Sequence, residues 1–118
     1  MKAKSALLAL ALLAAPALAA PARAASFDCA RAKAPDERAV CADRALNDQD
    51  VRLALLYELD AHFLPMGGRG AMMDDQVVWL RRRHACGADR ACLGRLYGAR
   101  IATLRAVIDD RVATHGPF

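Results

Sequence analysis

Apolar residues recur at three- and four-residue steps along the C-terminal half of the chain, which is the spacing of one face of an α-helix. The clearest stretch is 76–104, which predicts two helices joined by a tight turn at 87–89. Gly87 suits the end of the first helix, and Asp89 is able to cap the second. The apolar face of the second helix consists of Leu93, Leu96, Tyr97, Ile101, Leu104 and Ile108. The stretch is therefore expected to form a helical hairpin.

A short helix and a long helix are predicted before this hairpin. Residues 35–37, Pro-Asp-Glu, have the composition of a first helical turn, and the short helix is expected to end near Cys41. The long helix covers 44–64, with Asp43 as its cap. Its apolar face is expected to consist of Leu46, Leu53, Leu56, Tyr57, Leu59, Phe63 and Leu64. Its wetter side is expected to carry Asp48, Asp50, Arg52 and Glu58.

A glycine-rich segment at 65–70 separates the long helix from the hairpin. Its sequence, PMGGRG, predicts a flexible loop, so the third helix is expected to begin at Met72 and the fourth to run from Arg90 to about Val112. A phosphate-binding loop is disfavoured, because no Gly-Lys-Ser/Thr follows and no strand precedes the segment. The pattern as a whole predicts one all-α domain, a small three- to four-helix bundle.

Residues 1–24 have the composition of a secretory signal peptide. A short basic start precedes an uncharged apolar run over 7–15, and the motif Ala-Arg-Ala at 22–24 presents small residues at the two positions that a signal peptidase reads. The apolar run is too short to serve as a stable bilayer anchor. The segment is therefore expected to be removed.

Cleavage is expected after Ala24, with cleavage after Ala22 or Ala19 as alternatives, and would leave a single domain over 25–118. No cysteine directly follows the small-residue motif, so the product is expected to carry no lipid anchor and to be periplasmic or secreted. Cleavage after Ala24 removes three of the 17 basic residues and none of the 13 acidic ones, so the net charge falls from +4 to 14 − 13 = +1. That balance gives no support for binding to nucleic acid or a membrane surface.

Four cysteines, Cys29, Cys41, Cys86 and Cys92, lie beyond the leader. An even number in a short exported chain predicts two disulfides. Three pairings are possible, and Cys29–Cys41 with Cys86–Cys92 is preferred because each pair brackets one local turn. A zinc site is disfavoured, because the spacings contain no C-x2-C pair. The bundle is therefore expected to be stapled by two disulfides.

The residues after the leader offer little for catalysis. Ser26 is the single serine and lies beside the predicted new N-terminus, and paired cysteines leave no thiolate nucleophile. His62, His84 and His115 fall in three separate segments, so their spacing predicts no metal site. The three arginines at 81–83 point in different directions around a helix and cannot form one basic patch. A binding protein without a cofactor is expected, and not an enzyme.

Several side chains on the apolar faces are expected to combine packing with a polar contact. Tyr57, Trp79 and Tyr97 are expected in the core, with a hydroxyl or indole group reaching a polar partner. Arg83 follows Trp79 by one helical turn, so its stem is expected along the edge of the core and its guanidinium on an acid.

At these positions the sequence resembles the lysozyme inhibitor LprI-like N-terminal domain family, whose members are small exported domains that contain cysteines. The resemblance covers 27 to about 104 and is most specific in the frame Q-x-x-W-L-x-x-R-x-x-C at 76–86. The matching positions are Phe27, Asp28, Cys29, Glu37, Val40, Cys41, Asp43, Leu46, Asp50, Leu53, Tyr57, Gln76, Trp79, Leu80, Arg83, Cys86, Cys92, Leu93, Tyr97, Arg100, Ile101 and Leu104. The chain departs from the family at Arg44 and Gln49, where proline and leucine are usual.

The resemblance implies a helical, disulfide-stapled extracytoplasmic domain, and one branch of the family inhibits lysozyme. It also implies a framework role for Tyr57, Gln76, Trp79, Arg83, Tyr97 and Arg100. The expected function is an exported binding protein whose protein partner is a lysozyme. The alternative is an envelope-associated structural or accessory protein with another protein partner. For inhibition, Arg69 in the glycine-rich segment is the candidate that reaches the two catalytic carboxylates of the enzyme.

Overall fold

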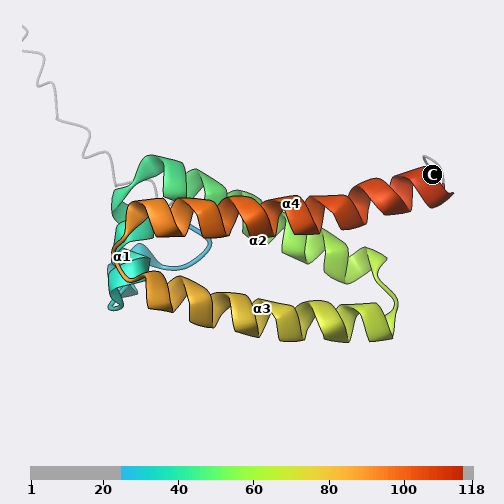
Figure 1. Ribbon diagram of the computed structural model, residues 1–118, viewed down its shortest axis with the longest axis horizontal. Coiled ribbons are helices and arrows are strands. Elements are labelled where there is room, and N and C mark those ends of the chain that lie inside the picture. Colours follow the sequence, from blue (N-terminus) through green and yellow to red (C-terminus); the bar gives the residue numbers. More distant parts are fainter. Residues whose placement is uncertain (1–24, 116–118) are drawn as a thin grey trace, which may run out of the picture.

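The computed structural model describes residues 25–115, which form four α-helices and one short 3₁₀-helix with no strand. The predicted all-α class is therefore confirmed for this part of the chain (Figure 1). The elements are η1 (Cys29–Arg31), α1 (Pro35–Ala42), α2 (Arg44–Phe63), α3 (Met66–Cys86) and α4 (Arg90–His115). The predicted signal peptide, 1–24, lies outside the described residues. No helix within 25–115 combines the length and the apolar composition that crossing a bilayer requires.

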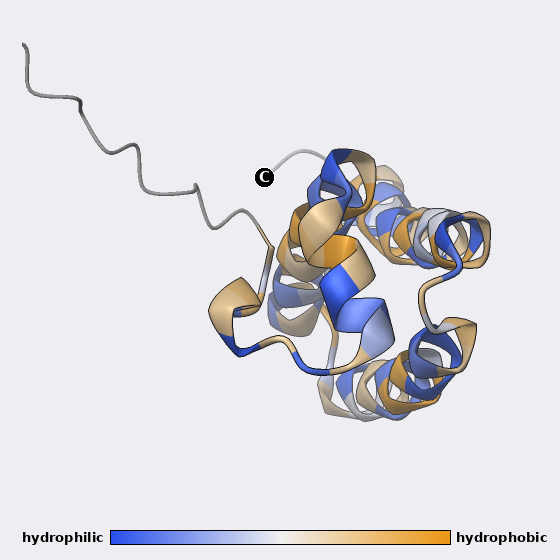
Figure 2. Ribbon diagram, turned by 90° about the vertical axis from the view of Figure 1, so that its left-hand side faces the viewer, coloured by the Kyte–Doolittle hydropathy of each residue, from blue (hydrophilic) through white to orange (hydrophobic). Residues whose placement is uncertain are grey.

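The helices pack unequally. The α2 and α4 helices make the most extensive contact, α1 packs on α2 at one end, and α3 contacts α4 more sparsely and α2 least. Figure 1 shows α3 running back beside α4, and the end-on view in Figure 2 shows hydrophobic and hydrophilic segments around each helix. The side of α2 that α3 does not cover stays open. Leu59 and Phe63, which were expected on the buried face, are therefore exposed.

The core is small and lies where α1, α2, α3 and α4 meet. Trp79 and Tyr97 form its centre, with their rings edge to face and their centroids 5.0 Å apart. Such a pair stabilises by roughly 1 kcal/mol beyond the area that it buries. The buried apolar residues are Ala39, Val40, Leu46, Leu53, Met72, Trp79, Leu93, Tyr97 and Leu104. Those of α4 recur at helical spacing, as predicted.

Both predicted disulfides are present. Cys29–Cys41 joins η1 to α1, and Cys86–Cys92 spans the turn between α3 and α4. The Cα–Cα distance is 5.7 Å in each, within the range that a disulfide bridges. Asp89 caps α4 through its Oδ1, which accepts from the backbone nitrogen of Cys92 at 3.0 Å.

The start of α1 and the start of α2 also follow their sequence signals. Glu37 Oε2 accepts from the backbone nitrogens of Lys33 and Ala34 at 3.0 and 3.1 Å, and these bonds lower the pKa of Glu37. Ala34 has no side-chain acceptor, so only the Glu37 half of a capping box is formed. Asp43 caps α2 by accepting from the backbone nitrogen of Leu46 at 3.1 Å.

The prediction of a flexible loop at 65–70 is wrong. Only Leu64 and Pro65 separate α2 from α3, and the backbone nitrogen of Arg69 already donates to the Pro65 carbonyl at 2.9 Å. Glycine lowers helix propensity by about 1 kcal/mol per residue but does not forbid helical dihedrals. Once the packed part of α3 has formed, extending it towards its start adds one hydrogen bond per residue. The three glycines therefore lie in the first turns of α3.

Candidate functional site

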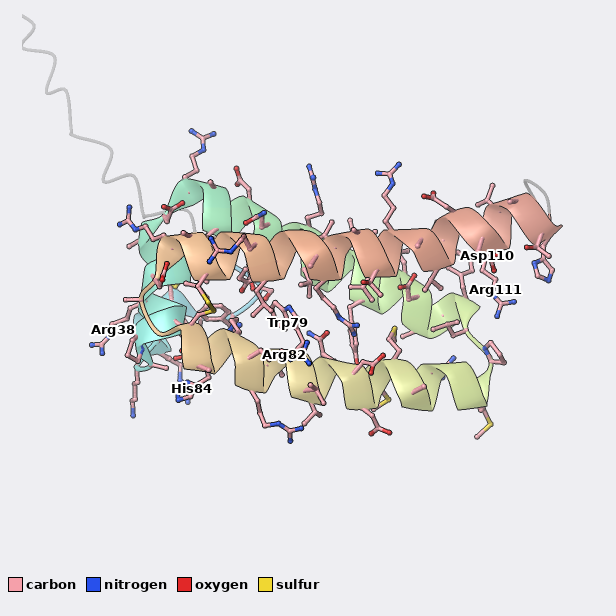
Figure 3. The ribbon with its side chains drawn as sticks, viewed as in Figure 1. Arg38, Trp79, Arg82, His84, Asp110 and Arg111 are labelled. Carbon is pink, nitrogen blue, oxygen red and sulfur yellow. A yellow bond between two sulfur atoms is a disulfide. The ribbon has the colours of Figure 1, made fainter. Side chains whose placement is uncertain are left out.

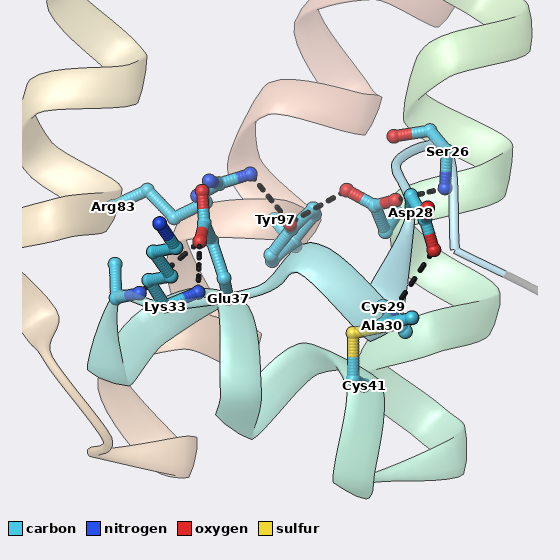
Figure 4. Close-up of a disulfide and its surroundings, with 11 residues drawn as sticks. Ser26, Asp28, Cys29, Ala30, Lys33, Glu37, Cys41, Arg83 and Tyr97 are labelled. Atoms are coloured by element: carbon cyan, nitrogen blue, oxygen red, sulfur yellow. Dashed lines mark hydrogen bonds between the residues drawn. A yellow bond between two sulfur atoms is a disulfide. The ribbon is translucent and has the colours of Figure 1, made fainter.

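A chain of buried polar groups connects four elements inside the bundle. Asp36 Oδ2 accepts from Arg83 Nε at 2.9 Å, and Arg83 NH1 donates to the Tyr97 hydroxyl at 3.5 Å. The Tyr97 hydroxyl donates to Asp50 Oδ1 at 2.8 Å, and the backbone nitrogen of Ser26 donates to Asp50 Oδ2 at 2.6 Å. Figure 4 shows Arg83, Tyr97 and Ser26 along this chain. We call these five groups the buried polar chain. They join the N-terminal lead, the segment 25–34 that precedes α1, to α1, α2, α3 and α4.

Arg83 lies at the centre of this arrangement, and its guanidinium contacts an acid, as the sequence led us to expect. Its Cζ lies 5.6 Å from the Phe27 ring centroid and 5.9 Å from the Trp79 ring, so aromatic faces flank the cation. Asp36 also lies 3.3 Å from His84 Nδ1 through its other oxygen. The Arg83 and Asp36 side chains are only 12% and 2% exposed, so this is a largely desolvated ion pair.

Asp50 corrects a sequence prediction. It was placed on the wetter side of its helix, yet it is 3% exposed. Its carboxylate is satisfied by Tyr97 and Ser26, which come from far away in the sequence. Burial, together with the adjacent Asp50 carboxylate, raises the pKa of the Tyr97 phenol, so Tyr97 remains a neutral donor at ordinary pH.

A second polar cluster lies between α2, α3 and α4. Arg100, 8% exposed, donates from Nε to Gln76 Oε1 at 3.0 Å and from NH2 to the Met72 carbonyl at 3.2 Å. Asp60 is fully buried, and neither of its oxygens has a hydrogen-bond partner among the described residues. Burial raises the pKa of Asp60, and the opposing attraction of the Arg100 guanidinium is weaker.

Replacing Asp60 by asparagine is expected to raise the free energy of unfolding at pH 7 by about 1–2 kcal/mol, because burial disfavours the charged form of Asp60 and asparagine carries no charge. Since the folded pKa is raised, the wild type is relatively most stable below pH ~4 and loses stability as the pH rises through the folded pKa. Urea unfolding at pH 3 and pH 7 measures the difference. Asp48→Asn, an exposed change on the same helix, is the control. A stabilisation of equal size at both pH values would contradict this account.

An open groove of about 310 Å³ runs between α3 and α4. Trp79 closes one part of it and donates from Nε1 to the Leu96 carbonyl at 3.2 Å. Arg82 lies at its exposed rim, and Figure 3 shows Trp79 and Arg82 between the two helices. The lining residues are Asp75, Val78, Trp79, Arg82, Leu96, Ala99, Arg100 and Thr103. The groove carries charges of both signs, and its size suits one side chain or a small ligand.

The predicted framework residues and the predicted partner-binding residue lie in different places. Gln76, Trp79, Arg83, Tyr97 and Arg100 all lie along the interior where α3 meets α4. Tyr57 is partly buried and packs against the core from α2. Arg69 is exposed in the first turn of α3 and does not line the groove.

Arg69 lies near the end of the bundle opposite α1. The two-residue turn after α2 leads directly into Met66, which is 88% exposed, and Arg69 follows one turn later. We call residues 64–69 the α2–α3 apex. Figure 1 shows this turn at the end of the bundle opposite α1. A large apolar side chain and a guanidinium are thus presented together on a short, helix-bounded turn.

Sequence reasoning assigned no role to Asp60 or Arg82, and it misplaced Asp50. Asp50 carried a usable signal, since it lies three residues before Leu53 and seven before Tyr57 and so shares their helical face. The Arg83–Asp36 contact joins residues 47 apart, and no local spacing could name that acid.

Within 25–115, no group of three or more histidine, cysteine, aspartate or glutamate residues is arranged to hold a metal ion. Comparisons with protein-family models, curated proteins and solved structures found no match to this chain.

Proposed function

We propose that this chain is an exported binding protein that uses the α2–α3 apex to contact a protein partner, and that lysozyme is the partner to test first. The exposure of Met66 beside Arg69 carries the proposal. Methionine and arginine are both enriched in protein interfaces, and arginine is among the residues that most often anchor them. The resemblance to the LprI-like family supports lysozyme as the partner.

The disulfides and the leader pattern both support the export that the proposal requires. Two disulfides indicate an oxidising environment, and disulfides persist in exported proteins. The leader pattern supports delivery to the periplasm or the medium. In both places the domain would meet enzymes that cleave the cell wall.

A short turn between two helices that carries exposed side chains can contact the cleft of an enzyme. Lysozyme-type glycosidases place two carboxyl groups on either side of the scissile bond, and a guanidinium can donate to both oxygens of one carboxylate. Because α3 begins at Met66, Arg69 is held on a helix, and less conformational entropy is lost on binding than a flexible loop would lose. The net charge of +1 offers little long-range attraction to a cationic enzyme, so the contacts at the apex must supply the affinity.

The test is lysis of bacterial cell walls by lysozyme, with and without the purified oxidised protein. Arg69→Ala and Met66→Ser are each expected to weaken inhibition by about tenfold or more, as for interface anchors. Arg105→Ala is the matched control, because Arg105 is an exposed arginine on α4. Circular dichroism would show that each variant keeps its helices.

The other outcomes are equally informative. If inhibition survives Arg69→Ala but is lost in Arg82→Ala, the α3–α4 groove and not the apex is the contact surface. If several types of lysozyme are all unaffected, the lysozyme proposal is wrong. The alternative, an envelope-associated accessory protein with a different partner, would then take its place.

A further inference from the structure

We infer that cleavage between Ala24 and Ala25 creates an α-ammonium group that serves as the cationic partner of the buried Asp50 carboxylate. The inference rests on the proposed export, because the leader must be removed to create this N-terminus. Removal of the signal peptide would then supply a cation to the buried Asp50 carboxylate as well as release the protein.

The N-terminal lead already approaches the Asp50 carboxylate closely. The Ser26 backbone nitrogen lies 2.6 Å from Asp50 Oδ2, and Ala25 is partly buried against the core. Consecutive backbone nitrogens lie within about 3.7 Å of each other, so the Ala25 nitrogen lies within about 6 Å of Asp50 Oδ2. Rotation about the Ala25 backbone bonds can therefore bring an amine at that nitrogen to the carboxylate.

The buried polar chain lacks one positive charge. It contains two carboxylates, Asp36 and Asp50, and one guanidinium, Arg83. Arg83 bonds Asp36 directly and reaches Asp50 only through the neutral hydroxyl of Tyr97. A buried charge without a counter-ion is costly, and removing one side of a buried pair destabilises strongly. In the unprocessed chain the nitrogen of residue 25 is a neutral amide, whereas in the processed chain it is a cation.

The other charged and titratable groups near Asp50 do not mask the pH dependence of the proposed ammonium–carboxylate pair. Those that face Asp50 or its neighbours are Tyr97 from α4, Arg83 from α3, Asp36 from α1 and Asp28 on the lead. Burial and the Asp50 carboxylate raise the pKa of Tyr97, which keeps its hydroxyl neutral, and the other groups are the same in the two chains that the experiment compares. His84 on α3 contacts Asp36 and is unchanged in both chains, so its contribution is the same in each.

The experiment compares two full-length chains exported from a bacterial host. One is the natural sequence, and the other has Gly-Ser-Gly inserted between Ala24 and Ala25, so that cleavage leaves three extra residues before Ala25. Mass spectrometry of the purified proteins establishes each N-terminus. Urea unfolding is then measured at pH 7 and at pH 10, with and without Asp50→Asn in each background.

The processed natural chain is expected to begin at Ala25 and to have an unfolding constant about tenfold smaller than the insertion variant at pH 7. Pairing stabilises the protonated amine, so the advantage is present below the unfolded pKa of the α-amino group, near 8, and is lost as the pH rises through its folded pKa. Asp50→Asn is expected to abolish the difference. If Asp50→Asn does not fold, competitive acylation of the wild-type N-terminus gives a second reading, and an α-amino pKa at its ordinary value would overturn the inference.

Other results separate this inference from the proposed function. Equal stabilities of the two proteins at pH 7, or a natural N-terminus other than Ala25, would overturn the pairing and leave lysozyme inhibition to its own assay. Retention of the leader would overturn export and pairing together.

Discussion

Replacing Arg83 by leucine is expected to lower the free energy of unfolding by about 3–5 kcal/mol. The substitution leaves the Asp36 carboxylate buried without its cation, and it removes the donor to the Tyr97 hydroxyl. It also removes the guanidinium that packs near Phe27 and Trp79. Urea unfolding at pH 7, followed by circular dichroism, measures the change.

The controls separate charge, geometry and position. Arg81→Leu changes an exposed arginine on the same helix and is expected to alter stability by no more than about 0.5 kcal/mol. Arg83→Lys keeps the charge but loses the forked geometry, so an intermediate loss is expected. Asp36→Asn in the Arg83→Leu background is expected to recover part of the loss, because the unpaired carboxylate is then neutral. A loss below about 1 kcal/mol for Arg83→Leu would show that the buried pair contributes little to the fold.

The parts of the fold that sequence reasoning recovered are those with local causes. The helix starts at Pro35 and Arg44 follow from proline and from caps a few residues away, and the α3–α4 turn follows from Gly87 and Asp89. Both disulfides close short loops, so the preferred pairing needed no knowledge of long-range geometry.

The parts that it missed depend on tertiary contacts. The glycines at 67–70 favour a loop by local propensity, and only the continuation of a packed helix overrides that preference. Asp50 reads as a surface acid until Tyr97 and Ser26 are brought to it from other parts of the chain. The α3–α4 groove depends on how α3 and α4 pack against each other, which no periodicity in either helix specifies.

Removal of both disulfides is the second large effect, with an expected loss of about 5 kcal/mol. In the loop-closure account, Cys29–Cys41, with a sequence separation of 12, contributes about 2.8 kcal/mol, and Cys86–Cys92, with a separation of 6, contributes about 2.2 kcal/mol. Small domains have total stabilities of about 5–15 kcal/mol, so the reduced protein is expected to be largely unfolded near 37 °C. Thermal unfolding of the protein with and without reductant measures this loss.

The two bridges are expected to differ by more than their loop lengths predict. Replacing both Cys29 and Cys41 by alanine frees the lead as well as enlarging the unfolded ensemble, so the Ser26 bond to Asp50 and the packing of Phe27 near Arg83 weaken too. Loop lengths alone give a difference of only about 0.6 kcal/mol between the two double variants. If the variant without Cys29 and Cys41 loses clearly more stability than loop length predicts, the excess comes from the contacts of the N-terminal lead. A larger loss for the variant without Cys86 and Cys92 would instead place the more important constraint at the α3–α4 turn.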